Sequence, residues 1–271
     1  MRARNTTTPN ARIKRFFVGA AFLAVTTFAA GANAQLNQQD QLELRTPLEP
    51  LRPGVSAVQI FDKLSAHNAL RSARLLNYTA LRTYQVVDPK GKVNAEEVGR
   101  MEYRAPDQKR FVVKSGSGSG LIRHLALNPL IASEIETAAG KQYRDSTISP
   151  ANYTLWPLGE QQVGPYHCFV AQVIPKRRDK YLFEGKIWIN DEDYAIVRIE
   201  GHPAKKLSFW IDTVDFVRQY QKIGSFWLPQ RDVTFVQVRF YGKKTLTIDH
   251  QDYNVNRTVA NSGSADRART F

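Results

Sequence analysis

The sequence predicts an α+β fold, in which helices are set against a mostly antiparallel sheet. Three observations lead to this fold class. Aromatic and β-branched runs fill the stretch from Tyr166 to Tyr253, short polar turns separate the runs, and two earlier segments have helical periodicity. Because tight turns join successive runs, neighbouring strands should pair antiparallel.

Turn residues delimit the strands of the C-terminal half. We expect strands over 166–174, 181–189, 194–200, 209–220, 226–241 and 245–255. The acidic turn 190–193 should be a hairpin tip, and Gly201-His202-Pro203 should end the third of these strands. In the fifth strand, Val233 and Phe235 fall on one face and Val236 on the other, so both faces carry apolar residues. Such a sheet packs against something on each side, or lines a cavity on one.

The N-terminal half combines helices with shorter strands. Residues 54–76 have apolar positions at helical spacing, including Val58, Phe61, Leu64, Leu70, Leu75 and Leu76. Strands are expected at 78–87, 93–104 and 109–115, and a further segment, 147–158, leads into the C-terminal sheet. Alternating serine and glycine predict a flexible hinge at 115–120. A second helical region follows at 121–139, and Pro129 should break it.

The chain starts with the features of a signal peptide. Five cations precede an apolar stretch of about 16 residues, and Ala32-Asn33-Ala34 fits a cleavage signal. A retained membrane anchor is the alternative, but roughly 20 apolar residues are needed to span a bilayer. We therefore divide the chain into a signal peptide (1–34), a flexible leader (35–53), one domain (54–257) and a disordered tail (258–271). The mature protein is expected in the periplasm, without a stable membrane span.

The net charge and the single cysteine limit which partners and which covalent cross-links we expect. Without the five cations of the signal peptide, 33 of the 38 basic residues remain against 25 acidic ones, a net charge of +8. This excess is compatible with an anionic lipid surface or nucleic acid, but we favour ordinary solubility as its explanation and expect no nucleic-acid partner. The one cysteine, Cys168, excludes an intramolecular disulfide and should be buried in its strand.

The sequence contains no motif that predicts catalysis. The five histidines lack the spacing of a zinc protease, and no Gly-x-Ser-x-Gly elbow is present. The acidic turn 191–193 lacks the twelve-residue pattern of a calcium loop. We therefore predict no catalytic residue, no metal site and no cofactor. An exported hydrolase remains an alternative that would need titratable groups converging in a cleft.

Two stretches of the C-terminal half resemble a known family. Tyr181-x-Phe183-Glu184-Gly185-Lys186-Ile187-Trp188-Ile189-Asn190, followed by Ile196 to Gly201, resembles the core hairpin of the outer-membrane lipoprotein-sorting proteins. This LolA-like group includes bacterial lipoprotein carriers and RseB-type periplasmic sensors. Phe226-Trp227-Leu228-Pro229 and the segment 246–253 are similar to later strands of the group.

The resemblance implies a curved antiparallel sheet, an incomplete β-barrel or half-barrel, with helices forming a lid across its concave face over an apolar cavity. In the carriers that cavity holds the acyl chains of a lipoprotein, and a cavity arginine holds the lid closed. The lid motif does not match here, so the sequence assigns that role to no arginine.

Two functions follow from these expectations. The first is non-catalytic binding of lipid or lipoprotein acyl chains in an apolar cavity, in outer-membrane lipoprotein sorting. The lining expected for it is Phe183, Ile187, Phe209, Val233, Phe235, Leu246 and Ile248. The second is a periplasmic protein-interaction or envelope-sensor module with a filled core, whose partners are envelope proteins. The aromatic content of the sheet fits either a filled core or a cavity.

Overall fold

The computed structural model of the protein describes residues 47–138, 146–206, 211–239 and 242–256. The predicted signal peptide, most of the predicted leader, Phe209 and the predicted tail lie outside the described residues.

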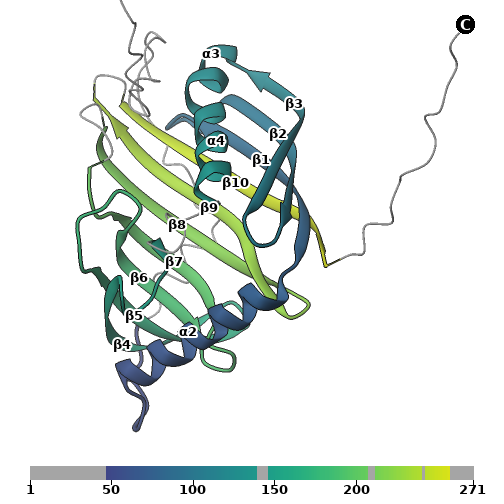
Figure 1. The fold of residues 1–271 in the computed structure, drawn as a ribbon. Helices are drawn as coiled ribbons and strands as arrows, with labels where there is room; N and C mark the ends of the chain where they lie inside the picture. Colours follow the sequence, from purple (N-terminus) through teal and green to yellow (C-terminus); the bar gives the residue numbers. More distant parts are fainter. Residues whose placement is uncertain (1–46, 139–145, 207–210, 240–241, 257–271) are drawn as a thin grey trace, which may run out of the picture.

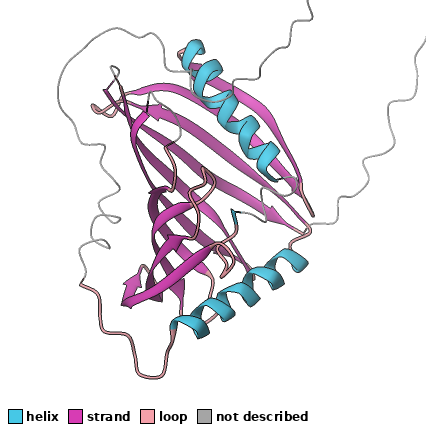
Figure 2. Cartoon of the chain, turned by 60° about the vertical axis from the view of Figure 1, so that its left-hand side comes forward, coloured by secondary structure: helices cyan, strands magenta, loops and turns pink. Residues whose placement is uncertain are grey.

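Ten antiparallel strands of the described residues form one open sheet (Figures 1 and 2). They are β1 (Asn77–Val87), β2 (Val93–Arg104), β3 (Gln108–Gly118), β4 (Tyr153–Val163), β5 (Tyr166–Pro175), β6 (Phe183–Asn190), β7 (Ile196–Pro203), β8 (Ile211–Ile223), β9 (Phe226–Val238) and β10 (Gly242–Val255). Their order is β3-β2-β1-β10-β9-β8-β7-β6-β5-β4. The sheet is therefore two meanders joined where β1 pairs with the last strand, and β3 and β4 are its edges. This confirms the predicted curved antiparallel sheet.

The alternation of side chains explains why the strands form where predicted. In β1, residues Tyr78, Ala80, Arg82, Tyr84 and Val86 are buried, and each intervening residue is half-buried. One face of the strand therefore packs against the interior while the other is partly solvated.

The first helix, α2 (Ala57–Arg74), begins at Ser56, whose Oγ accepts a hydrogen bond of 3.2 Å from the backbone N–H of Gln59. It buries Ile60, Phe61 and Leu64. The predicted apolar stripe was partly wrong, because Val58, Leu70 and Leu76 are exposed. The helix packs on the sheet through about one turn of apolar residues near its start.

The second helical region runs through Pro129 without a break. It comprises α3 (Gly120–Ile122), a π-helical turn η1 (Arg123–Leu127) and α4 (Asn128–Ala138). The N–H of Asn128 donates to the carbonyl of Arg123, five residues earlier. The predicted break is therefore wrong. The wider π turn lies directly before the proline, and Pro129 occupies the start of α4, where a helix tolerates it.

Two segments that were predicted to be a hinge and a strand break, 115–118 and 201–203, belong to strands in the structure. Residues 115–118, expected to be a flexible hinge, pair with β2 from Val98 to Ala95. A Cβ at Gly118 would lie 2.5 Å from the Asn94 carbonyl oxygen, and its φ is 71°, so glycine is needed there for close backbone packing rather than flexibility. Likewise, Gly201-His202-Pro203 continues β7 and pairs with β6. Composition alone does not reveal the backbone hydrogen bonds that a neighbouring strand supplies.

Strand register assigns each residue to one of two faces. One row of directly paired residues crosses the sheet as Tyr84, Ile248, Asp232, Arg218, Ile199, Ile187 and Ala171. Paired residues project to the same side of a sheet. Tyr84 and Ile248 pack in the cluster with α4, and Ile187 and Ile199 pack in the cluster with α2. Both helices therefore cover the same side of the sheet, which we call the helix face.

Each helix covers its own apolar cluster on the helix face. Below α2 lie buried residues of β4 to β7, including Phe169, Ala171, Val173 and Ile187. Below η1 and α4 lie Tyr84, Val86 and Ala95. A separate cluster on the opposite face joins Trp188 and Trp227 with the buried Cys168, as predicted for that thiol.

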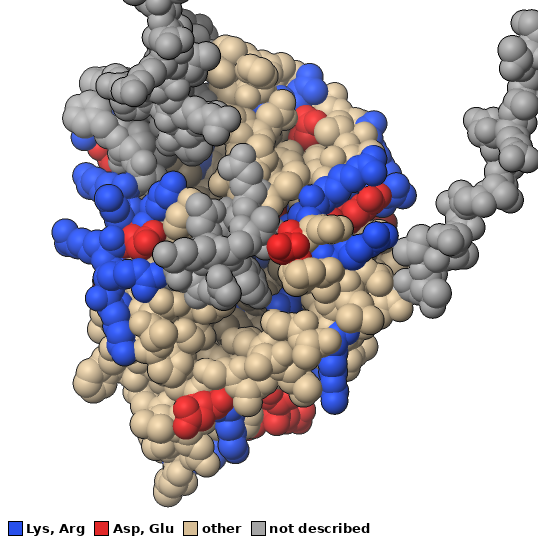
Figure 3. Space-filling model, in the orientation of Figure 1, with Lys and Arg blue, Asp and Glu red and all other residues tan. Residues whose placement is uncertain are grey.

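Within the described residues, no helix has the length and apolar character needed to cross a membrane. Seen from the side that bears the helices, basic side chains gather along both flanks and are interleaved with acidic ones (Figure 3). On β2, for example, Arg100 lies 3.0 Å from Glu102. This mixture does not form the unbroken basic surface expected for nucleic-acid binding.

Replacing Ile187 with alanine should destabilise the protein by about 3 kcal/mol, because its side chain is fully buried below α2 and leaves a cavity. The matched control is Val58→Ala on α2, where 70% of the residue is exposed and an effect within about 0.5 kcal/mol is expected. Urea unfolding measures both. Equal effects would contradict the packing described for this face.

Candidate functional site

Charged side chains occupy the middle of the helix face, between the two apolar clusters. In the cross-sheet row, Asp232 on β9 and Arg218 on β8 stand between Ile248 and Ile199. Burying charge costs free energy unless each charge is paired. The partners of these charges therefore determine how the face is organised.

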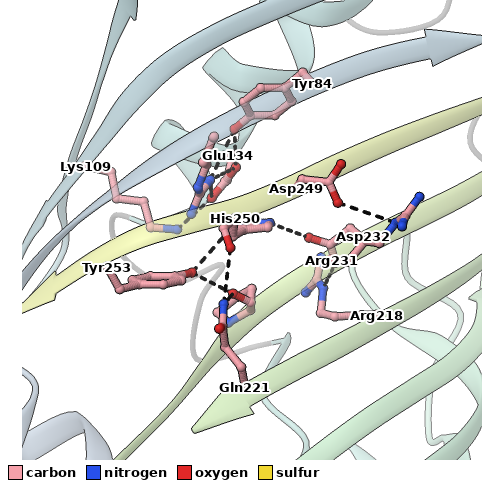
Figure 4. A network of polar contacts seen from close by, with 12 residues as sticks. Tyr84, Lys109, Glu134, Arg218, Gln221, Arg231, Asp232, Asp249, His250 and Tyr253 are labelled. Carbon is pink, nitrogen blue, oxygen red and sulfur yellow. Dashed lines mark hydrogen bonds and ion pairs between the residues drawn. The ribbon is translucent and has the colours of Figure 1, made fainter. Parts of the chain in front are cut away.

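An ion pair fastens α4 to the sheet (Figure 4). Arg82, on β1, is only 2% exposed, and its Nη1 donates to both carboxylate oxygens of Glu134 on α4, at 2.6 and 2.7 Å. Lys109 of β3 donates to the same carboxylate at 3.1 Å, and the Tyr84 hydroxyl donates to it at 3.3 Å. We call Arg82, Glu134, Lys109 and Tyr84 the α4 clasp. It joins two strands to one helix through a single carboxylate.

The α4 clasp keeps Glu134 ionised. Burial alone would raise the pKa of this carboxyl group, but the attraction of Arg82 and Lys109 outweighs burial and lowers the pKa from 4.5 to about 2. Burial, together with the nearby Glu134 charge, raises the pKa of the Tyr84 hydroxyl, so the phenol stays protonated and can donate. The clasp is therefore intact throughout the neutral and mildly acidic range.

A second polar group lies beside the first on β8, β9 and β10. Asp232 accepts hydrogen bonds from Arg218 Nε and from His250 Nε2, the latter at 3.0 Å. The carboxylate is an acceptor, so the proton of the imidazole is assigned to Nε2. Burial lowers the pKa of His250, and the attraction of Arg218 holds the pKa of Asp232 below its usual value against burial. The Tyr253 hydroxyl donates to the Pro229 carbonyl at 2.8 Å and lies 3.5 Å from His250 Nδ1.

This arrangement does not form the machinery of a hydrolase. The side-chain neighbours of His250 are a carboxylate and a phenol, not a serine or cysteine nucleophile. Cys168 is buried in the cluster on the opposite face. No group of three or more metal-ligating side chains occurs within the described part of the chain.

The structure separates the residues predicted to line one cavity. Phe183 and Ile187 lie on the helix face below α2, and Leu246 and Ile248 lie on the same face near α4. By contrast, Val233 pairs with Thr247 and Val217 and therefore points to the opposite face, as does Phe235. The seventh, Phe209, lies outside the described residues. Four of the seven thus share the helix face, in two groups divided by the charged centre.

Directly below α4, the described residues leave no open hollow. Leu127 and Ile131 of the helical region are buried against Tyr84 and Val86, so side chains fill the space below α4. A cavity of about 610 Å³ lies elsewhere, between the β4–β5 turn and strands β8 to β10. Its lining is mostly polar. An apolar site below α4 therefore requires α4 to move.

Sequence reasoning missed the α4 clasp, although one signal was available. Arg82 stands at an inward position of β1, between Ala80 and Tyr84, where every second residue is buried. An arginine in the buried half of such an alternation needs a partner. That partner, Glu134, lies 52 residues further along, and only the folded structure identifies it.

The fold and site define the protein as an open antiparallel sheet with two helices fastened over one face. The chain belongs to a family of unknown function (DUF5686), whose model matches residues 76–253. No curated protein matches the sequence significantly.

Several solved structures are similar to the chain. An outer membrane lipoprotein-sorting protein domain from Vibrio parahaemolyticus has 12% identity and a TM-score of 0.47, covering 78% of this chain and 96% of that one. A LolA superfamily protein from Nitrosomonas europaea has 10% identity and a TM-score of 0.35, with coverage of 76% and 96%. The MucA/MucB complex structure of Pseudomonas aeruginosa has 12% identity and a TM-score of 0.25, with coverage of 73% and 100%.

Replacing Glu134 with glutamine should destabilise the protein by about 2 kcal/mol at pH 7, less than a fully buried pair because Glu134 is 30% exposed. Since the folded-state pKa of Glu134 is about 2, its stabilising effect is complete above pH 4.5 and is lost as the pH falls towards 2. Urea unfolding should therefore give the same difference in unfolding free energy between the wild-type chain and Glu134→Gln at pH 7 and at pH 5.5. At pH 3 this difference should be at most half as large. A difference that stays constant to pH 3 would contradict the assigned ion pair.

Proposed function

We propose that this chain is an exported, non-catalytic periplasmic protein that binds the acyl chains of a lipid or lipoprotein on the helix face, below α4. The observation that carries the proposal is the α4 clasp. A buried ion pair is an inefficient way to hold a permanent core helix, because apolar side chains of similar volume often stabilise the packing as well or better. The structure then corresponds to the closed, empty form.

The surface that α4 covers suits a hydrocarbon chain. Tyr84, Val86 and Ala95 form its floor, and Leu246 and Ile248 of β10 border it. Leu127 and Ile131 close it from above. If α4 swings away, both the floor and the apolar side of the helix become available, and an acyl chain between them replaces the contacts that are lost.

The free energies of ion-pair separation and of acyl-chain burial favour such an exchange. Separating a buried ion pair costs about 3–5 kcal/mol. Burying a methylene group gains about 0.8 kcal/mol, so ten methylenes of one acyl chain gain about 8 kcal/mol. One chain therefore offsets the opening of the clasp, whereas a short or polar ligand does not. No nucleotide is needed for binding, which suits a compartment without ATP.

Arg82 has the features required of a lid arginine. In the carriers that the sequence resembles, an arginine in the cavity holds the lid closed. Arg82 projects from the helix face and contacts the helix through Glu134. Its Nε is buried and has no hydrogen-bond partner among the described residues, so a donor remains for a lipid ester or amide carbonyl.

Uptake of a fluorescent C16 fatty acid tests the proposal. The wild-type chain should bind the probe with a Kd on the order of 1 µM, and Ile248→Asn should weaken binding at least about tenfold by placing an amide in the acyl path. Glu134→Gln should accelerate uptake, because the clasp is released. The control is Val113→Asn on β3, where the valine is already exposed. Failure of the wild-type chain to bind, or equal binding by Ile248→Asn, would contradict the proposal.

A second candidate, binding of an envelope protein, is favoured by one observation. Edge strand β4 exposes Trp156 and Leu158, and its neighbour β5 exposes Ile174. Exposed apolar residues on an edge strand are typical of protein contact sites. In this alternative the helix face is a permanent core.

Cross-linking in intact cells distinguishes the two candidates. For the interaction module, a photo-cross-linker at position 156 should capture one specific envelope protein, and Trp156→Ser should reduce capture at least about tenfold. Acyl uptake should then be absent. For the acyl binder, Trp156→Ser should leave probe uptake unchanged.

A further inference from the structure

The polar cavity of about 610 Å³ has a composition that the proposed acyl binding does not use. It lies between the turn that joins β4 to β5 and three neighbouring strands, β8, β9 and β10. By strand register its floor includes the directly paired residues Gln219, Arg231 and Asp249 on the face opposite the helices. The cavity is therefore separate from the surface below α4. Its volume is within the range of small-ligand pockets.

Amide side chains dominate the lining of this cavity. Four glutamines border it, Gln219, Gln221, Gln230 and Gln251. A glutamine side chain carries two donors and one carbonyl acceptor, which together match the alternating donors and acceptors of adjacent hydroxyl groups. Tyr166 and Tyr220 contribute aromatic surface, and the Tyr166 ring is braced by Trp227 at a centroid distance of 4.7 Å. Amides beside fixed aromatic rings suit a ligand with hydroxyl-bearing edges and less polar faces.

The charges of the lining disfavour a polyanionic ligand. Arg231 faces Asp249, with 3.5 Å between Nε and Oδ1, so its charge is already balanced (Figure 4). Asp252 adds a second carboxylate. Burial lowers the pKa of His250, so its imidazole adds no positive charge at pH 7. The lining as a whole is neutral to slightly acidic, unlike a site for phosphate or sulfate groups.

Two irregularities of the sheet lie at the cavity. Gln219 pairs with Arg231 but Tyr220 pairs with Pro229, so Gln230 is an extra residue in β9. On β10, an extra residue at Asp252–Tyr253 shifts the register against β1, and Asp252 has a φ of 52°. Bulges redirect side chains and are frequent beside binding sites. Here both bulges contribute a residue to the same lining, Gln230 and Asp252.

We propose that this cavity is a binding site for a neutral sugar chain, with the exposed amides of Gln230 and Gln251 bound to ring hydroxyls and the ring of Tyr166 or Tyr220 against a sugar face. The site has room for a short run of sugar rings. It is independent of acyl-chain binding, because it lies on the other face of the sheet. A protein with both sites holds a lipid on one face and a glycan on the other.

Titration of the full chain with N-acetylchitotetraose and with maltotetraose tests the proposal, using isothermal calorimetry and amide chemical shifts. At least one of these neutral tetrasaccharides should bind with a Kd on the order of 0.1–1 mM. The shifted amides should cluster at β8 to β10 and the β4–β5 turn. A sulfated heparin tetrasaccharide should bind at least about tenfold more weakly.

Matched glutamine variants locate the site. The double variant Gln230→Ala/Gln251→Ala removes two exposed amides of the lining and should weaken binding at least about tenfold. The control Gln108→Ala removes an exposed amide from β3, outside the cavity, and should change the Kd less than about twofold. The proposal is overturned if neither neutral tetrasaccharide binds at about 10 mM. It is equally overturned if the double variant binds normally, or if the heparin fragment binds more tightly.

Discussion

The organisation of the helix face depends on the ion pair between Arg82 and Glu134. The sheet provides a continuous surface, but its centre carries charges that no apolar helix can cover. The Glu134 carboxylate accepts hydrogen bonds from both Arg82 and Lys109, so it connects α4 to β1 and β3. The same carboxylate neutralises the buried guanidinium of Arg82. If α4 left without compensation, Arg82 would lose its partner while still largely surrounded by the sheet. The position of α4 and the charge state of the face are therefore one linked equilibrium.

This linkage reconciles the filled space below α4 with the proposed binding of an acyl chain. Between the described residues there is no open hollow directly below α4, because Leu127 and Ile131 occupy the space above β1. A helix held by polar contacts over an apolar floor is nevertheless exchangeable, since hydrocarbon can replace its apolar contacts. By contrast, the cluster below α2 has twelve buried residues, against five in the cluster below η1 and α4. In the proposed function, the cluster below α2 therefore stays packed while α4 moves.

The sequence predicted the strands well because turn residues and side-chain alternation are local properties. Val93–Arg104 was predicted with its observed limits, and β5 differs by one residue. Register is not local: Val233 and Ile187 are both apolar strand residues, yet they point to opposite faces because the pairings between β6 and β9 fix their relation. The contact between Arg82 and Glu134 likewise depends on how a helix packs across two strands. The four predicted residues on the helix face were identified by their apolar alternation, but the charged centre that divides them was not.

The most direct test of a movable α4 is the distance between α4 and the sheet with and without lipid. Spin labels at Ala132→Cys on α4 and Gln108→Cys on β3, in a chain carrying Cys168→Ala, report that distance by pulsed electron paramagnetic resonance. The account predicts a single short distance in the empty protein and a longer one when a C16 fatty acid is bound. An unchanged distance in a protein that has bound the fatty acid would contradict it.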